Sequence, residues 1–166
     1  HKADIFEGGH RVPFLARWPG KIQAGTVSHQ VTCLTDLIAT VAEINGAELE
    51  PSEGVDSYSI LPALLGKGEN PIREATVHHS INGSFAIRKG PWKLILCPGS
   101  GGWSDPKPGS PAEENLPPYQ LYKLDEDPAE SRNLIEDYPE MVEELVELMK
   151  SYIENGRSTA GPRMPY

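Results

Sequence analysis

The sequence predicts an α+β fold, in which the last strand and helix of an α/β domain precede a four-stranded antiparallel sheet with a long helix. Three observations favour this fold. Near the start, an apolar run with strand composition is followed by a segment with helical apolar spacing. In the middle, segments of period two flank an Asn-Gly pair, the strongest short signal for a hairpin. Towards the end, Pro139 opens a long amphipathic segment.

Residues 1–70 are predicted to form the end of the α/β domain. The segment from Val12 to Trp18 is a nearly continuous apolar run, which suits a strand buried on both faces. A helix is predicted from Leu34 to Asn45, because apolar residues recur there at helical spacing and Gly46 follows where a helix is expected to end. A short helical turn over 60–65 closes this part.

Residues 71–156 are predicted to form the sheet and the long helix, and residues 157–166 a flexible tail. The acidic residues of the long helix lie mostly in its first half, where the helix dipole favours negative charge, and are interpreted as a solvated face. A loop over 98–118 is rich in Gly, Pro and Ser, and loops of this length are usually functional or disordered. The four strands are expected over 76–79, 84–88, 92–97 and 120–124.

Composition and charge narrow the classes of protein that need considering. The 166 residues are 38% hydrophobic and 23% charged, and the 16 glycines and 16 prolines favour many turns over a helical bundle. A net charge of −9 argues against nucleic acid or an anionic membrane as a partner, and no apolar run approaches the ~20 residues of a membrane span. Cys33 and Cys97 fit neither a disulfide framework nor a zinc site, and two unpaired thiols are favoured over a single bridge.

Residue types alone nominate few chemical groups. Lys2, beside the backbone turn at Glu7-Gly8-Gly9, is by itself typical of a surface lysine. His78 and His79 are neighbours on a strand, so they face opposite sides and do not share a metal. Trp103, in a glycine-rich stretch, suits a packing anchor of the long loop. The sequence contains no Ser/His/Asp order, zinc-protease motif, calcium loop or phosphate loop.

Five segments, taken in order, carry a resemblance to a known family. The first reads Lys-Ala-Asp-Ile-Phe-Glu-Gly-Gly-His-Arg-Val-Pro and is soon followed by Trp-Pro-Gly. Together the segments resemble the motifs of the type I sulfatase (arylsulfatase) family of the alkaline phosphatase superfamily, and this chain resembles the C-terminal portion. The matching segments are 2–20, 31–40, 54–66, 88–95 and 121–134.

The resemblance implies a parent enzyme that hydrolyses aryl or carbohydrate sulfate esters with a formylglycine nucleophile and a calcium ion. Lys2 resembles the family's lysine that contacts the sulfate, which implies a catalytic role. Trp103 and Ser104 stand where some sulfatases bring a histidine towards the substrate, and are expected to bind substrate at the pocket rim. Cys97-Pro98-Gly99-Ser100 departs from the family's Cys/Ser-x-Pro-x-Arg motif, so the nucleophile is expected upstream.

Several expectations follow for the chain as it stands. It should be inactive alone, bind neither cofactor, and need the N-terminal part of the same enzyme and a sulfated small molecule or glycan as partners. Family resemblance implies export to the periplasm, the outside or the lysosome, although no signal segment opens the sequence. The strand from Val12 to Trp18 would lack sheet neighbours, which predicts aggregation, dimer formation or disorder of the first ~60 residues.

Two alternatives stay open at this point. The first is a phosphonate or phosphate monoester hydrolase of the same superfamily, which would carry an unmodified Thr or Ser nucleophile upstream. The second is a non-catalytic module for glycan binding or oligomer contact, because residues 74–156 could fold without the rest.

Overall fold

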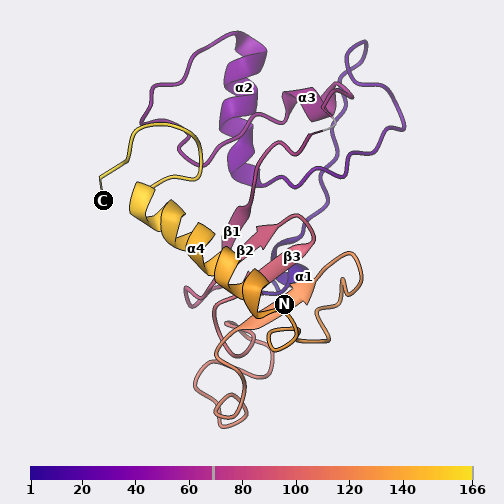
Figure 1. Ribbon diagram of the computed structural model, residues 1–166. Coiled ribbons are helices and arrows are strands. Elements are labelled where there is room, and N and C mark those ends of the chain that lie inside the picture. Colours follow the sequence, from indigo (N-terminus) through magenta and orange to yellow (C-terminus); the bar gives the residue numbers. More distant parts are fainter. Residues whose placement is uncertain (69, 166) are drawn as a thin grey trace. The chain divides into compact units, whose positions relative to one another are not determined.

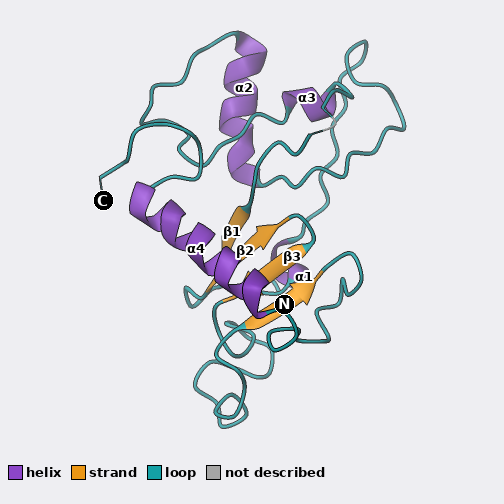
Figure 2. Ribbon diagram, viewed as in Figure 1, coloured by secondary structure: helices purple, strands orange, loops and turns teal. Residues whose placement is uncertain are grey.

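The computed structural model describes residues 1–68 and 70–165 (Figure 1). Glu69, in the first predicted domain, and Tyr166, in the predicted tail, lie outside the described residues. Helices and strands are coloured separately in Figure 2. In chain order the elements are α1 (Glu7–His10), the 3-10 turn η1 (Leu34–Asp36), α2 (Leu37–Asn45), α3 (Leu61–Leu64), β1 (Thr76–His79), β2 (Phe85–Lys89), β3 (Trp92–Ile95), β4 (Gln120–Lys123) and α4 (Pro139–Asn155).

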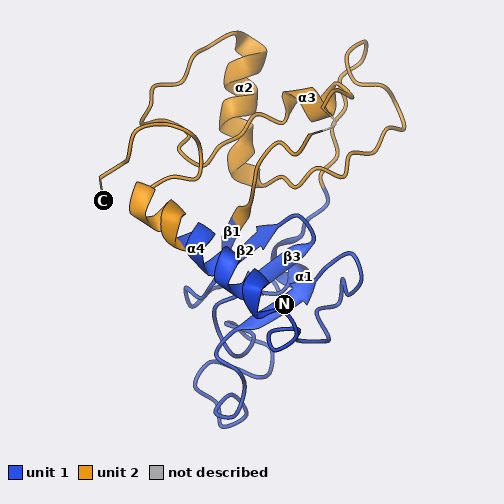
Figure 3. Cartoon of the chain, viewed as in Figure 1, with its two compact units in different colours: residues 1–13, 77–149 blue, residues 14–76, 150–166 orange. Residues whose placement is uncertain are grey.

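The chain divides into two compact units (Figure 3). His1–Pro13 and Val77–Met149 form the first, called the sheet unit below. Phe14–Thr76 and Lys150–Tyr166 form the second, called the helical unit. The first thirteen residues therefore belong with the sheet, which lies more than sixty residues later in the sequence. The predicted domain boundary after residue 70 stays a prediction.

The sheet has four antiparallel strands in the order β1-β2-β3-β4, and the predicted α+β class, sheet and long helix are confirmed. The hairpin predicted at Asn82-Gly83 forms between β1 and β2. There the backbone N–H of Ser80 donates to the carbonyl of Ser84 at 2.9 Å, and Gly83 has a φ of +85°. Because that φ is in the left-handed region, glycine is the residue that adopts it without strain.

Both faces of this sheet are covered. Register pairs Arg88 with Lys93, and Lys93 in turn with Tyr122, so these three side chains share one face. That face meets the N-terminal segment, whose Ile5 is fully buried in one cluster with residues of the sheet. The opposite face meets the first turns of α4. It carries the ion pair Lys89–Glu144 at 2.9 Å and the ring contact Trp92–Tyr138 at 4.9 Å.

The strand predicted from Val12 to Trp18 does not form. Val12 and Phe14 are about half exposed, and Leu15 is 94% exposed. A strand needs a neighbour to pair its backbone N–H and C=O groups, and no described strand lies beside this segment. The segment does have the apolar composition of a strand, but this composition forms a strand only where other strands flank it.

The helix predicted over residues 34–45 is confirmed as η1 followed by α2, and Gly46 ends it with a φ of +64°. Asp36 organises its start. The Asp36 side chain is fully buried, pairs with Arg73 at 2.6 Å, and accepts the backbone N–H of Cys33 and of Tyr58. The apolar side of the helix is exposed at Leu34 (65%), Leu37 (42%), Ile38 (55%), Val41 (55%) and Ile44 (41%).

Candidate functional site

The segment that carries Lys2 is tightly held, although Lys2 itself is exposed. Ala3, Asp4 and Ile5, which follow it, are all buried. The carbonyl of Ala3 accepts the backbone N–H of Ile81 at 3.0 Å, and the N–H of Ile5 donates to the carbonyl of Ser100 at 2.9 Å. The backbone next to Lys2 is thus fixed on both sides of Asp4, while the ammonium group stays in solvent.

The two glycines of α1, Gly8 and Gly9, differ in how closely other atoms surround them. A Cβ atom at Gly8 would meet nothing within 4 Å. A Cβ atom at Gly9 would overlap the carbonyl oxygen of Asp4 and lie 2.9 Å from that of His1. The turn expected at these residues is therefore a short helix, and only its second glycine allows the chain to fold back over the residues beside Lys2.

The structure brings the loop residues Trp103 and Ser104 to this segment. Oδ1 of Asp4 accepts the backbone N–H of Trp103 at 2.7 Å and that of Ser104 at 3.1 Å. Oδ2 accepts the hydroxyl of Ser104 and lies 2.7 Å from the amino group of His1. Trp103 is 53% exposed, so its ring is not the buried packing anchor that residue type suggests. Asp4 thus ties Trp103 and Ser104 to the backbone segment that also carries Lys2.

Sequence reasoning missed Asp4. Burial raises its pKa, but the hydrogen bonds from the Ser104 hydroxyl and from the two loop N–H groups favour the ionised form and lower it. The carboxylate is therefore ionised across the ordinary pH range and acts only as an acceptor. The one signal in the sequence is an acidic residue between the apolar Ala3 and Ile5.

A cluster of buried charged side chains joins the N-terminal segment to the sheet. The side chain of Lys93 is fully buried, and its Nζ lies 2.7 Å from Oε1 of Glu130 and 3.3 Å from Oε1 of Glu7. The backbone N–H of Glu7 donates to Oε2 of Glu130 at 2.5 Å, and Arg88 lies 3.4 Å from Glu7. Three segments that resemble family motifs therefore converge here: 2–20 through Glu7, 88–95 through Arg88 and Lys93, and 121–134 through Glu130.

The electrostatics of the cluster keep Glu7 ionised. Burial by itself raises the pKa of Glu7, but a hydrogen bond with His10 and the charges of Lys93 and Arg88 outweigh it and lower the pKa to about 2. Because its charges are paired and enclosed, this cluster holds segments together and presents no open group to a substrate.

His78 and His79 have different surroundings, as expected for neighbours on a strand. The ring of His78 stacks on that of His10 with centroids 4.1 Å apart, whereas His79 is exposed and tilts towards Phe85. Burial, together with the nearby positive charges of His10 and Lys93, lowers the pKa of His78 to about 3. His78 is consequently neutral at ordinary pH.

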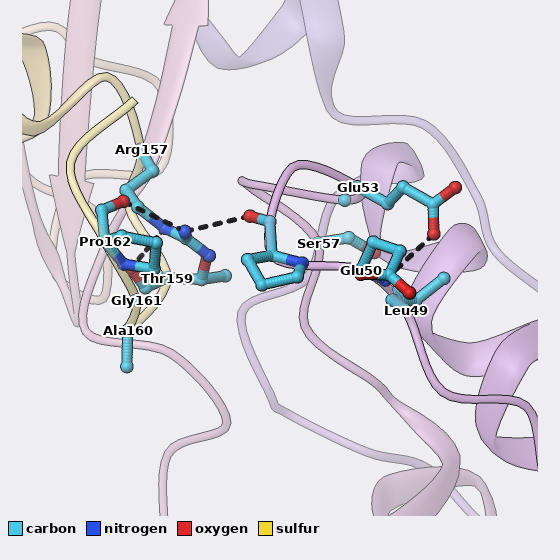
Figure 4. Close-up of a pocket in the computed structure, with 11 residues that line it drawn as sticks. Leu49, Glu50, Glu53, Ser57, Arg157, Thr159, Ala160, Gly161 and Pro162 are labelled. Atoms are coloured by element: carbon cyan, nitrogen blue, oxygen red, sulfur yellow. Dashed lines mark hydrogen bonds between the residues drawn. The ribbon is translucent and has the colours of Figure 1, made fainter. Parts of the chain in front are cut away.

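The helical unit contains a pocket of about 320 Å³, whose lining residues come from the segments 49–57 and 157–162 (Figure 4). Arg157 lies in its wall, but its guanidinium donates to the carbonyls of Pro51, Thr159 and Pro162 at 3.0 to 3.2 Å. These bonds occupy the donors that would attract an anion, so we do not assign this pocket as the site. The flexibility predicted for residues 157–166 stays a prediction.

Among residues 1–68 and 70–165, no group of three His, Cys, Asp or Glu side chains is placed to hold a metal ion. The described residues therefore do not fit the calcium ion that the family resemblance implies. Cys33 and Cys97 are both free thiols, the state favoured over a single bridge, but only Cys97 is buried and Cys33 is partly exposed.

Individual known proteins are similar to this chain, although no family model matches the sequence. The chain is 34% identical over 160 residues to arylsulfatase A of Bos taurus, and 33% identical over 153 residues to an N-acetylgalactosamine-6-O-sulfatase of Bacteroides thetaiotaomicron. Each match covers 90% of this chain but only 31% and 29% of the relative, respectively.

Solved structures agree with these relatives. A 6S-sulfatase from a Bacteroides thetaiotaomicron locus for glycosaminoglycan metabolism matches with a TM-score of 0.73 and 32% identity, over 90% of this chain and 30% of that one. A sulfatase from Pseudoalteromonas matches with a TM-score of 0.68 at 20% identity, over 92% of this chain and 31% of that one, which shows a shared fold. The chain thus spans about a third of the length of the proteins it matches.

Proposed function

This chain belongs to the sulfatase family, and on that premise we propose that it is the C-terminal portion of an enzyme that hydrolyses aryl or carbohydrate sulfate esters. The observation that carries the proposal is the assembly around Asp4. The backbone N–H groups of Trp103 and Ser104 bind the buried carboxylate of Asp4, which follows Lys2 by two residues, while Lys2 and Trp103 are themselves exposed. A cation and an aromatic ring are the groups that an anionic ester with an organic body requires.

In this proposal Lys2 is the catalytic residue of the chain. The protein has a net charge of −9, so its overall field repels a sulfate ester and a local cation is needed to receive the sulfate. An ammonium group beside the sulfate stabilises the negative charge that moves to the bridging oxygen as the ester bond breaks. Trp103 and Ser104 contact the organic part of the ester at the rim.

The nucleophile and the metal are proposed to lie upstream, in the N-terminal part of the same enzyme. Formylglycine and calcium are what the family resemblance assigns to that part, and they would supply the attacking group and the polarisation of the sulfate. The roles proposed for Lys2, Trp103 and Ser104 are binding and charge stabilisation by their own groups.

We propose that the same N-terminal part covers the exposed apolar side of η1 and α2. Five apolar side chains at helical spacing are 41–65% exposed there, and Leu15 in the unpaired run is 94% exposed. Surfaces of this kind are usually interfaces. The covering segment is taken to be upstream because the chain spans about a third of its relatives and resembles their C-terminal portion. No helix within the described ranges is long and apolar enough to cross a membrane, and export stays a proposal.

The test uses the full-length parent and its Lys2→Ala variant. With 4-nitrophenyl sulfate, Lys2→Ala should lower kcat/KM by about 10²-fold or more, the usual effect of removing one group that stabilises transition-state charge. Lys21→Ala, at an exposed lysine of the helical unit, is the matched control and should leave turnover unchanged. The 166-residue chain alone should show no turnover.

Two results would contradict the proposal. One is an unchanged rate for Lys2→Ala. The other is a parent that hydrolyses a phosphate or phosphonate monoester faster than the sulfate ester, which would favour the alternative hydrolase of the same superfamily.

A further inference from the structure

Asp4 follows Lys2 in the chain and binds the backbone N–H of Trp103, but unlike these two residues it is buried. Its side chain is 2% accessible, and it is two residues from Lys2. It accepts three hydrogen bonds from the loop, two from the backbone N–H groups of Trp103 and Ser104 and one from the hydroxyl of Ser104. Hydrogen bonds to an ionised acceptor are about twice as strong as neutral ones. Asp4 is therefore the main polar link between residues 1–5, which form the Lys2 segment, and residues 100–104, which form the tip of the loop.

The loop tip lies directly on the Lys2 segment and is closed on itself. A Cβ atom at Gly102 would lie 2.5 Å from both the carbonyl oxygen of Ala3 and Oδ1 of Asp4, so only glycine allows this approach. The hydroxyl of Ser100, which is fully buried, donates to the carbonyl of Ser104 at 2.6 Å and accepts the N–H of Gly102 at 3.1 Å. The tip thus forms a compact turn whose attachment at its outer end is Asp4.

We propose that Asp4 is a positioning residue that fixes Trp103 at a set spacing from Lys2, and thereby sets which sulfate esters the parent enzyme accepts. This inference rests on the proposed function. Lys2 meets the sulfate, which all substrates share, whereas Trp103 meets the organic body, which differs between them. A fixed spacing between the two therefore favours esters of one size, because binding geometry that is set in advance costs less ordering entropy.

The first test needs no activity and uses the 166-residue chain. Hydrogen exchange at the amides of Trp103 and Ser104 should become at least about tenfold faster in Asp4→Ala, because both amides lose their acceptor. Asp4→Asn keeps one acceptor oxygen at the same place and should restore most of the protection. Asp125→Ala, at an exposed aspartate after β4, should change nothing. Equal exchange in Asp4→Ala and the unaltered chain would overturn the inference.

The second test measures specificity in the full-length parent. The readout is the ratio of kcat/KM for a 6-O-sulfated N-acetylhexosamine to kcat/KM for 4-nitrophenyl sulfate. Asp4→Ala should change this ratio by at least about tenfold, which corresponds to about 1.4 kcal/mol, and Asp4→Asn should restore it to within about threefold. A merely structural loss would lower both rates together and leave the ratio unchanged, which would refute positioning.

A double-mutant cycle with Trp103→Ala tests whether Asp4 acts through the ring. In the Trp103→Ala background, Asp4→Ala should change the ratio by less than about twofold, because the group that it positions is gone. Full additivity of the two changes would count against the inference. Should Asp4→Ala fail to fold, Gly102→Ala displaces the loop from Asp4 without touching a proposed substrate contact and is expected to shift the ratio as well.

The failure of this inference can be told apart from failure of the proposed function. Lys2→Ala is assayed in parallel in the same parent. If Lys2→Ala lowers turnover and Asp4→Ala leaves the ratio unchanged, only the positioning role is wrong. If Lys2→Ala has no effect, the proposed site itself is wrong, whatever Asp4 does.

Discussion

Replacing Lys93 with methionine tests what holds the sheet unit together. The methionine side chain has a similar length but no charge, so Lys93→Met leaves the carboxylates of Glu7 and Glu130 buried without their shared ammonium group. The side chains of these two glutamates are only 6% and 2% exposed. Arg88 at 3.4 Å and Arg11 at 3.9 Å would then be the arginines left beside Glu7.

The magnitude follows from the two distances. At an effective dielectric constant of 20, Coulomb attraction is about 6 kcal/mol at 2.7 Å and about 5 kcal/mol at 3.3 Å. Desolvation of each buried ion opposes this by several kcal/mol, so the attraction is not the net contribution. Loss of one partner from a buried ion pair typically costs about 3–5 kcal/mol, and we expect Lys93→Met to lower the free energy of unfolding by this amount.

The assay is urea unfolding of the 166-residue chain, followed by tryptophan fluorescence and circular dichroism. Lys89→Met is the matched control, because Lys89 forms a partly exposed ion pair with Glu144 at 2.9 Å. Such pairs are worth about 0–1 kcal/mol, so the control should unfold near the unaltered chain.

A triple variant separates charge imbalance from lost packing. Lys93→Met combined with Glu7→Gln and Glu130→Gln removes the unpaired buried charges and should recover part of the stability. A loss below about 1 kcal/mol in the single variant, or a triple variant less stable than the single one, would refute the reasoning.

Two further predictions concern the same unit. The folded pKa of His78 is about 3, below its ordinary value of 6.5, so its contribution to stability is complete above pH 6.5 and is lost as pH falls towards 3. The folded pKa of Glu7 is about 2, below its ordinary value of 4.5, so a second loss of stability begins below pH 4.5. The urea concentration at the unfolding midpoint should therefore fall progressively between pH 7 and pH 4. In His78→Asn this midpoint should change less with pH above pH 4.5. The second prediction compares two adjacent glycines. Gly9→Ala should destabilise by about 1–3 kcal/mol through overlap with the Asp4 carbonyl, whereas Gly8→Ala, with open space around it, should be neutral within about 0.5 kcal/mol. Equal unfolding midpoints for the two variants would contradict the second prediction.

Local patterns predicted the elements that complete themselves within the chain. Asn82-Gly83 marked a hairpin that needs only its two flanking strands, and Gly46 marked the end of a helix whose hydrogen bonds are internal. The run from Val12 to Trp18 failed as a predicted strand because its partners would have to come from elsewhere. A strand, unlike a helix, takes its hydrogen bonds from another segment.

The site was predicted in part. Lys2, Trp103 and Ser104 were identified from resemblance, but nothing in the sequence connected positions a hundred residues apart. Asp4 gave no signal beyond its apolar neighbours, because the groups that bind it are two backbone amides and a hydroxyl, which every loop possesses.

The sequence by itself indicated the resemblance to sulfatases and the sheet with its long helix, and through that resemblance it nominated Lys2, Trp103 and Ser104 for the proposed site. Tertiary structure alone decided which charges are enclosed. The alternation of side chains along the strands places Lys93 and Arg88 on one face of the sheet. That face is buried only because the folded N-terminal segment, which carries Glu7, packs on it. The physical reason is that burial depends on what covers a side chain, and here the cover comes from residues more than eighty positions away.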